Sequence, residues 1–222
     1  MSPSYLLVRV DRIRSRNPHG FGGVIVSASA IDEQGEVRTH ENVYSVRLPY
    51  RIADASTVQP GQRWLIHGNI QLQTRGQGND VSTEWDVQAD SAELCKPCGK
   101  QVIDLIERSP DFCGIGRIKA LKLWSRFGEE LYRLLDDGDA EGLTEVLTLE
   151  VANVAIAAWA KFCQIRTIQV LRRFEISEEV CANVTRYYGR EIEKKMADDP
   201  YRLLSFAANW NKVDQLAPPV SG

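Results

Sequence analysis

The residues with the clearest chemical potential lie between positions 109 and 128, where the chain reads SPDFCGIGRIKALKLWSRFG. Gly114 and Gly116 flank a single apolar residue, Ile115, and glycine lets a backbone turn through positive φ. We expect a tight turn between two helices, in which Ile115 is buried and backbone N–H groups point outward. Such donors, at the partly positive end of the following helix, can bind one phosphate oxygen.

Basic side chains follow this turn, in the order Arg117, Lys119, Lys122 and Arg126. No acidic residue occurs between Asp111 and Glu129, so the local sequence is positive although the chain carries a net charge of -3. Contacts of this kind touch the nucleic-acid backbone and not the base edges, and they predict salt-sensitive binding that is indifferent to sequence. The predicted DNA-binding residues are Gly114, Ile115, Gly116, Arg117, Lys119 and Lys122. The alternative is an ordinary interhelical turn followed by the solvated face of an amphipathic helix.

The part of the chain before this segment is typical of a small β domain. Up to about Glu93 it contains short segments rich in β-branched and aromatic residues, separated by turn clusters. The predicted strands are 5–11, 21–31, 42–48, 63–72 and 83–89. Five such strands predict a small closed barrel, for which the five-stranded OB-like barrel is the commonest match, although other small barrels and meanders share the pattern. We therefore expect an OB-like β-barrel domain over residues 1–93.

The rest of the chain is typical of helices. After Pro97, apolar residues such as Val102, Leu105 and Ile106 recur at intervals of three and four. Glycine, proline and aspartate interrupt the pattern repeatedly and predict helices of about ten to fifteen residues in a compact bundle. The predicted fold class is α+β, with an all-α domain over residues 98–217 that joins the barrel near 94–98.

With these elements, the chain resembles the N-terminal region of RecD-like DNA helicases over essentially all 222 residues. The motifs that carry the resemblance are Gly114-Ile115-Gly116 with Phe127-Gly128, the segment AIAAWAKF from Ala155, and the run YYGREIEKKMADDPYRLL from Tyr187. In that family an OB-like domain and tandem helix-hairpin-helix units precede two RecA-like ATPase lobes. The resemblance implies tandem helix-hairpin-helix units here, single-stranded or forked DNA as the partner, and a role in DNA repair and recombination.

The chain departs from the family pattern in the later units. By alignment, Thr148-Leu149-Glu150 replaces the second Gly-apolar-Gly turn and puts a carboxylate where a phosphate would approach. We expect this second unit to serve packing. In the third unit Asn209-Trp210-Asn211 stands near the expected glycines, and asparagine tolerates the left-handed conformation.

The sequence contains no recognisable catalytic site. No G-x-x-x-x-G-K-[ST] motif occurs, since Cys98-Gly99-Lys100 lacks both the upstream glycine and the following Ser or Thr that would hold magnesium. We expect neither enzymatic activity nor a cofactor in these residues. The resemblance assigns ATP, Mg²⁺ and 5'-to-3' movement to a C-terminal helicase motor, and we expect the chain to be a fragment that ends just before it.

Cysteine usage and hydropathy bear on the compartment. Five cysteines, an odd number spread from Cys95 to Cys181, do not make a disulfide framework and favour the reducing cytoplasm. Cys95 and Cys98 alone are too few to hold a structural zinc ion. No segment approaches the roughly 20 apolar residues of a membrane helix, so we expect a cytoplasmic protein without a membrane partner.

The barrel offers a second candidate site, because OB barrels bind single strands by stacking bases on aromatic residues beside a basic track. The candidates are Arg9, Arg12, Arg14, Arg16, His19, Phe21, Tyr44, Arg47, Tyr50, Trp64 and Arg75. Against this site, residues 1–93 hold nine Arg and no Lys against eleven Asp plus Glu. The strand pattern also favours a core position for Trp64.

Two other functions are open alternatives. A junction-binding protein resembling RuvA also joins an OB barrel to tandem hairpins, but it needs two intact glycine hairpins and a tetramer interface. A protein-interaction adaptor would use the degenerate hairpins and the acidic barrel to bind a replication or repair protein, without contact to DNA.

Overall fold

The computed structural model describes residues 4–17, 23–32, 35–37, 43–75 and 82–216. The chain divides into two compact units, Met1–Ala155 and Ile156–Gly222. The boundary falls inside the long helix α5 (Leu149–Arg173), and each unit is described by itself. None of the described helices has the length and apolar character needed to cross a membrane.

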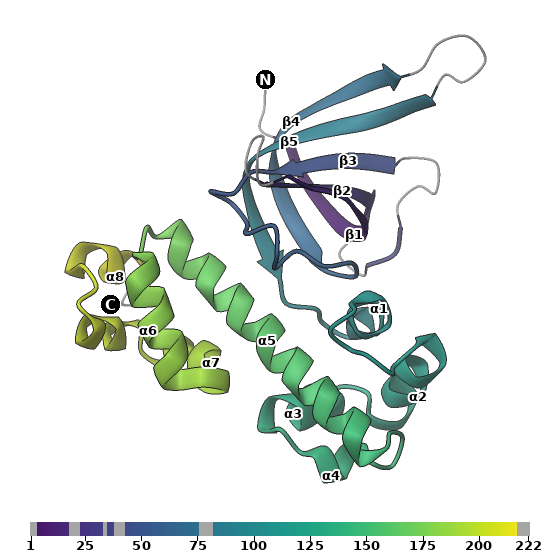
Figure 1. Ribbon diagram of the computed structural model, residues 1–222, viewed down its shortest axis with the longest axis vertical. Coiled ribbons are helices and arrows are strands. Elements are labelled where there is room, and N and C mark those ends of the chain that lie inside the picture. Colours follow the sequence, from purple (N-terminus) through teal and green to yellow (C-terminus); the bar gives the residue numbers. More distant parts are fainter. Residues whose placement is uncertain (1–3, 18–22, 33–34, 38–42, 76–81, 217–222) are drawn as a thin grey trace. The chain divides into compact units, whose positions relative to one another are not determined.

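Five strands close into a barrel in the first unit (Figure 1). They are β1 (Ser4–Asn17), β2 (Gly23–Ala30), β3 (Val43–Leu48), β4 (Arg63–Arg75) and β5 (Ser82–Cys95). The order around the barrel is β1-β2-β3-β5-β4; β3 and β5 are parallel and the other neighbouring strands are antiparallel. The predicted closed barrel of five strands is confirmed, and the arrangement is consistent with an OB-like barrel.

Alternating side chains fill the inside of the barrel. Along β2, Val24, Val26 and Ala28 are buried, and in the β2–β3 ladder Val24 and Val26 lie opposite Leu48 and Val46. Branched side chains on alternate positions suit a pleated surface with one buried face. The barrel therefore derives from the period-two pattern of the sequence.

Three strands extend beyond the predicted ends. β4 and β5 pair antiparallel from Arg63 opposite Cys95 to Arg75 opposite Ser82. Residues 90–93, which are mostly polar and show no alternation of apolar side chains, belong to β5 because they complete this ladder. β1 likewise continues to Asn17 along β2, with register shifts on both sides of Arg12. Residues 21, 22 and 42 of the predicted strands lie outside the described residues.

The remaining elements are helical. In chain order they are α1 (Gln101–Arg108), α2 (Arg117–Phe127), α3 (Glu130–Asp137), α4 (Ala140–Leu143), α5, α6 (Glu178–Tyr188), η1 (Gly189–Glu191), α7 (Ile192–Asp198), η2 (Pro200–Phe206) and α8 (Trp210–Leu216). α5 has 25 residues, so the predicted length of about ten to fifteen residues is wrong for this helix. No glycine or proline interrupts positions 149–173, and nothing breaks the helix there.

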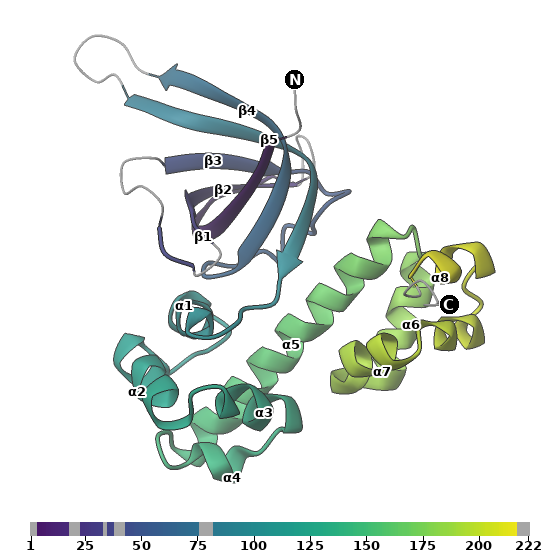
Figure 2. The same ribbon diagram turned by 180° about the vertical axis from the view of Figure 1, so that it is seen from behind.

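A cluster of charged side chains joins the barrel to α1. This helix lies against the end of the barrel in both views (Figures 1 and 2). Asp104 accepts from Arg9 of β1 at 3.2 Å and from Arg63 of β4 at 3.5 Å. Burial disfavours the charge of both guanidiniums. At Arg9, Asp104 and Asp11 outweigh burial and raise the pKa, whereas at Arg63 burial dominates and lowers the pKa. Arg63 therefore depends on the Asp104 carboxylate as its counter-charge.

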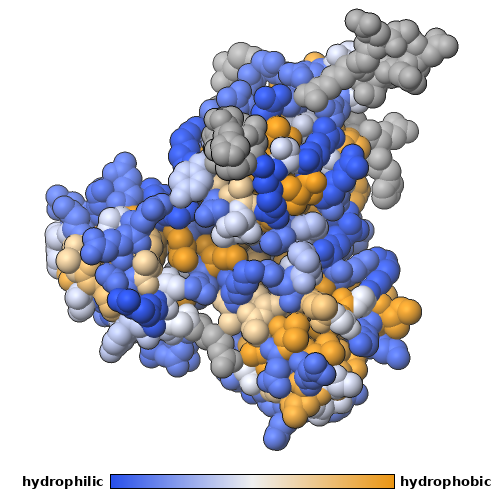
Figure 3. Space-filling view, in the orientation of Figure 1, coloured by the Kyte–Doolittle hydropathy of each residue, from blue (hydrophilic) through white to orange (hydrophobic). Residues whose placement is uncertain are grey.

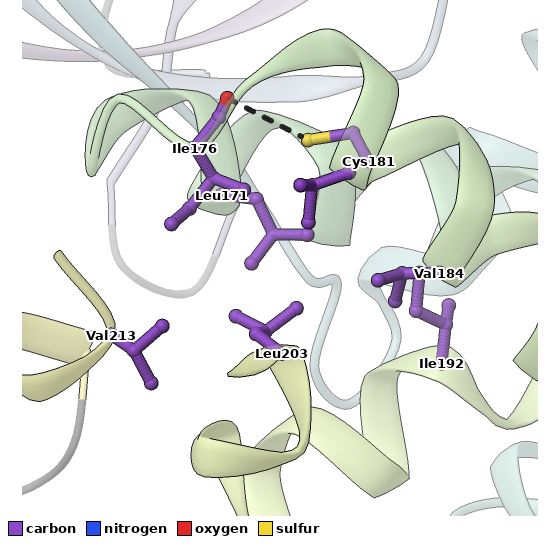
Figure 4. Packing of buried hydrophobic residues seen from close by; sticks show 8 residues of the cluster. Leu171, Ile176, Cys181, Val184, Ile192, Leu203 and Val213 are labelled. Atoms are coloured by element: carbon purple, nitrogen blue, oxygen red, sulfur yellow. Dashed lines mark hydrogen bonds between the residues drawn. The ribbon is translucent and has the colours of Figure 1, made fainter. Parts of the chain in front are cut away.

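The second unit has its own apolar core, shown in Figure 4. The buried cluster comprises Leu171, Ile176, Val180, Cys181, Val184, Ile192, Leu203 and Val213. These residues come from the end of α5, from α6, α7, η2 and α8, and from the turn before α6. Tyr188, Met196 and Phe206 pack around the cluster. Three-and-four spacing along α6 places Val180 and Val184 on one face.

We predict that Asp104→Ala lowers the free energy of unfolding by about 3 kcal/mol, because Arg63 stays buried without its counter-charge. Urea denaturation followed by tryptophan fluorescence measures this change. Arg133→Ala is the matched control, since its ion pairs with Glu130 and Asp137 lie at the surface of α3 and contribute little. Equal urea concentrations at the midpoint of unfolding for the two variants would contradict the role assigned to Asp104.

Candidate nucleic-acid interface

The turn at residues 114–116 connects the end of the α1 region to α2. Gly114 has φ +85°, the left-handed region that favours glycine. Ile115 is 3% exposed, and its N–H donates to the Phe112 carbonyl at 3.2 Å. Gly116 is extended, with φ -88° and ψ -178°, and it is the N-cap of α2. The left-handed residue thus lets the chain reverse while the isoleucine stays in the core.

The first amides of α2 are available to a ligand. Among the hydrogen bonds of the described residues, none is donated by the backbone N–H of Gly116, Arg117 or Ile118. The first N–H groups of any helix lack an intrahelical acceptor and carry part of the positive charge of the helix dipole. No side chain caps this end, so no described side chain accepts a hydrogen bond from these N–H groups. An anionic oxygen fits these donors.

The space beside Gly116 is open. A Cβ atom built on this residue would meet no described atom within 4 Å, and the φ of Gly116 is one that any residue adopts. Neither the backbone conformation nor the packing therefore requires glycine here. At Gly114, by contrast, φ is positive and a Cβ would lie 3.4 Å from Val151. Glycine is a favoured N-cap residue, and the lack of a side chain also lets another molecule approach the backbone closely here.

In the folded structure, two of the basic residues after the turn form ion pairs with glutamates. Arg117 Nη1 lies 3.2 Å from Glu107 Oε2, and Arg126 Nε lies 2.5 Å from Glu145 Oε2. Lys119 Nζ donates to the Gly114 carbonyl at 2.8 Å, which holds its charge at the turn. Lys122 is exposed and makes no ion pair among the described residues. The cations remain at the surface, but two of them are partly neutralised by glutamates from α1 and from the turn after α4.

Thr148-Leu149-Glu150 does not form a turn like 114–116. Thr148 caps the start of α5, with its Oγ1 3.4 Å from the Val151 N–H. Leu149 is 54% exposed, so it does not fill the buried position that Ile115 occupies. The alignment that placed a second turn here is therefore not matched by the local geometry.

A similar order of backbone conformations recurs instead at residues 175–177, although the Ile115 N–H donates to a carbonyl three residues back and the Ile176 N–H to one five residues back. Glu175 has φ +55°, Ile176 is 4% exposed and Ser177 is the extended N-cap of α6. Like α2, α6 has 11 residues and ends at a glycine with φ +52°. The signal in the sequence was the spacing, since Gly128 follows Ile115 and Gly189 follows Ile176 by the same interval. Glutamate at the left-handed position concealed the similarity, because it seldom adopts positive φ.

A third turn of this kind precedes α8. Ala207 has φ +64° and the Asn209 Oδ1 accepts from the Asn211 N–H at 3.0 Å. Asparagine was expected to supply the left-handed residue, but Ala207 does so and Asn209 caps the helix. The Ala208 N–H donates to Leu203 O as the Ile176 N–H donates to Leu171 O, so the second and third turns share one hydrogen-bond pattern.

The second and third turns carry different charges from the first. α6 begins with Glu178 and Glu179, whose carboxylates would repel a phosphate. Lys212 of α8 donates to the Glu175 carbonyl at 2.9 Å and lies 3.1 Å from its carboxylate. The turn at 114–116 combines unbonded amides with several neighbouring cations and no acidic residue in the first turn of its helix. The helix α8 also begins without an acidic residue, but its Lys212 is paired with Glu175.

The barrel candidates are mostly engaged within the protein. Arg14 pairs with Glu84 at 2.7 Å and Arg47 pairs with Asp86 at 3.4 Å, while Trp64 is fully buried. Tyr44 is half-buried and stacks on Trp85 with ring centroids 6.4 Å apart. His19 and Phe21, and the side chain of Arg75, lie outside the described residues.

The cysteines and possible metal ligands form no site in the described part of the chain. All five cysteines are outside disulfides. Within the described ranges, no three His, Cys, Asp or Glu side chains come together in a group that could hold a metal ion. In the described part of the chain, Cys95 and Cys98 therefore do not belong to a group of three or more possible metal ligands.

We predict unequal losses of stability for substitutions at the two glycines of the turn. Gly114→Ala should lower the free energy of unfolding by about 1 to 2 kcal/mol, because alanine is strained at positive φ. Gly116→Ala should lower it by only about 0.5 kcal/mol, because its φ is ordinary, its Cβ meets open space and only the poorer N-cap propensity of alanine acts. Thermal and urea denaturation of both variants test this; equal destabilisation by the two substitutions would show that Gly116 is needed for packing.

In comparisons with known proteins, no family model, no curated protein and no solved structure matches this chain. Its function has to be inferred from the conformation and chemistry of its own residues.

Proposed function

We propose that this chain is a DNA-binding region of a RecD-like helicase and that the turn at 114–116 binds the DNA backbone without regard to sequence. In this proposal Gly114, Ile115 and Gly116 shape the turn, and its free amides donate to one phosphate oxygen. Arg117, Lys119 and Lys122 add attraction to the phosphates. Single-stranded or forked DNA is the partner.

The observation that carries the proposal is the combination of open space and free donors at Gly116. Its own N–H and those of Arg117 and Ile118 have no acceptor among the described residues, and a Cβ on Gly116 would touch nothing within 4 Å. A phosphate oxygen needs this close approach to reach backbone donors at 2.7–3.2 Å, the usual range of such hydrogen bonds.

The charges around the turn also support the proposal. The Lys119 ammonium is held at the Gly114 carbonyl, next to the amides, and Lys122 is exposed one turn further along α2. The pair between Arg117 and Glu107 is exposed on the arginine side, at 66%. Exposed ion pairs are weak, so Arg117 can exchange Glu107 for a phosphate at small cost.

The repeated turns support the family assignment. The three turns, each with a left-handed residue followed by an apolar residue and a helix N-cap, are what tandem helix-hairpin-helix units require. They follow a five-stranded barrel in the chain, which is the order found in the N-terminal region of RecD-like helicases. The second and third units would then be packing units, because acidic residues or internal contacts occupy them.

The catalytic part of the activity lies elsewhere in this proposal. ATP hydrolysis with Mg²⁺ and 5'-to-3' movement belong to the RecA-like motor lobes of the parent helicase, in cytoplasmic DNA repair and recombination. The region described here would hold DNA beside that motor and perform no chemistry itself.

We predict that Gly116→Asp weakens DNA binding about tenfold or more while the fold is retained. Aspartate is a favoured N-cap and its charge suits a helix N-terminus, so the helix should be as stable as before. Its carboxylate would occupy the free amides and repel phosphate. Fluorescence anisotropy with single-stranded and forked DNA at low and moderate salt gives the affinity, and urea denaturation gives the stability.

Ser177→Asp is the matched control, because Ser177 has the same N-cap position at the turn before α6. This variant should bind DNA as the unaltered chain does. Unchanged binding by Gly116→Asp would refute the assignment of the site. An unaltered chain that binds no DNA even at low salt would instead support the protein-interaction adaptor.

A second prediction concerns the salt dependence. Lys122→Ala should reduce the slope of log affinity against log salt by about one, because one phosphate contact is lost. Lys194→Ala, which removes an exposed cation from α7, should leave the slope unchanged. Equal slopes for all three proteins would mean that Lys122 does not contact phosphate.

A further inference from the structure

α2 exposes two large apolar side chains beside the proposed phosphate site. Ile118 is 72% exposed and Leu121 is 44% exposed. They are three residues apart and therefore lie on the same face of the helix. Figure 3 shows apolar surface over this part of the first unit. We call Ile118 and Leu121 the apolar pair.

Packing within the protein does not explain the apolar pair. The buried residues of α2 are Ala120 and Leu123. Aligned from the N-cap, these positions match the buried residues Cys181 and Val184 of α6. The same alignment matches the apolar pair with Glu179 and Ala182, both exposed. A helix that follows this kind of turn thus needs no large apolar side chain at either position of the pair.

The apolar pair is next to the free amides. The N–H of Ile118 is itself one of the unbonded donors, and side chains on a helix lean toward its N-terminus. An oxygen bound at this N–H would have the Ile118 side chain beside it. Cations flank the pair, since Arg117 and Lys119 adjoin Ile118 and Lys122 adjoins Leu121, and α2 contains no acidic residue.

We infer that the apolar pair packs against the sugars and unstacked bases of an unpaired strand whose phosphate is bound at 114–116. This inference rests on the proposed function and adds to it the side chains that contact an unpaired strand. This face of α2 combines cations, which attract an anionic backbone, with apolar side chains, which can pack against an apolar part of the ligand. A single strand offers both, because its base faces are open to contact; a duplex keeps the same faces stacked inside. The site therefore prefers single-stranded DNA to duplex.

The test is the double variant Ile118→Ser with Leu121→Ser. Anisotropy is measured with an oligothymidine of ~20 nucleotides, which exceeds the usual footprint of one small binding domain, and with a duplex of equal length. Affinity for the single strand should fall about tenfold, as expected for the loss of a largely buried aliphatic side chain. Affinity for the duplex should change less than about twofold, and the salt slope should stay constant, because no phosphate contact is removed.

Leu72→Ser is the matched control, since Leu72 is a 56% exposed leucine on β4 outside the proposed site; it should leave both affinities unchanged. If Gly116→Asp abolishes binding but the double variant binds oligothymidine normally, the apolar pair makes no contact with DNA. This result would overturn the inference and leave the proposed function in place. Equal losses for single strand and duplex would also overturn it. An unaltered chain that binds neither probe removes the proposed function as well and points to a protein partner for this face.

Discussion

The left-handed residue before each turn helix is the constraint on which the helical part of the structure depends. The chain must reverse direction within three residues and still bury the apolar residue that follows, and a positive φ achieves both. Gly114 adopts it freely. Glu175 and Ala207 adopt it at a cost of about 1 kcal/mol or more, offset by paired hydrogen bonds to the preceding helical turn. The reversal also leaves the first amides of the next helix facing outward.

The backbone alone does not decide what these turns bind. The turns at 114–116 and 175–177 share a left-handed residue, a buried isoleucine and an 11-residue helix. The helices differ at their first positions, where α2 carries Arg117 and α6 carries Glu178. Because a helix N-terminus favours anions, glutamate at this position stabilises α6 from within the chain. In α2 the corresponding favourable charge would have to come from a ligand.

The ion pairs of the first unit have unequal importance. The Asp104 carboxylate faces Arg63, whose side chain is 4% exposed, and it joins α1 to the barrel. The pairs of Arg117 and Arg126 lie at the surface, where solvent weakens them. The buried cluster thus belongs to the architecture, whereas the exposed pairs can be exchanged when an anionic partner arrives.

The sequence by itself determined the elements whose signal is local. Alternation along residues 24–28 and 44–48 predicted strands, three-and-four spacing predicted helices, and Gly114-Ile115-Gly116 predicted a turn with a buried isoleucine. The strand ends at Asn17 and Cys95 depended on pairing with a distant strand, which no local pattern reports. The turn at Glu175 was concealed because a glutamate takes a conformation that its residue type disfavours. Only the tertiary structure brought Glu107 to Arg117 and Glu145 to Arg126, since these charges belong to different elements and meet only when those elements pack.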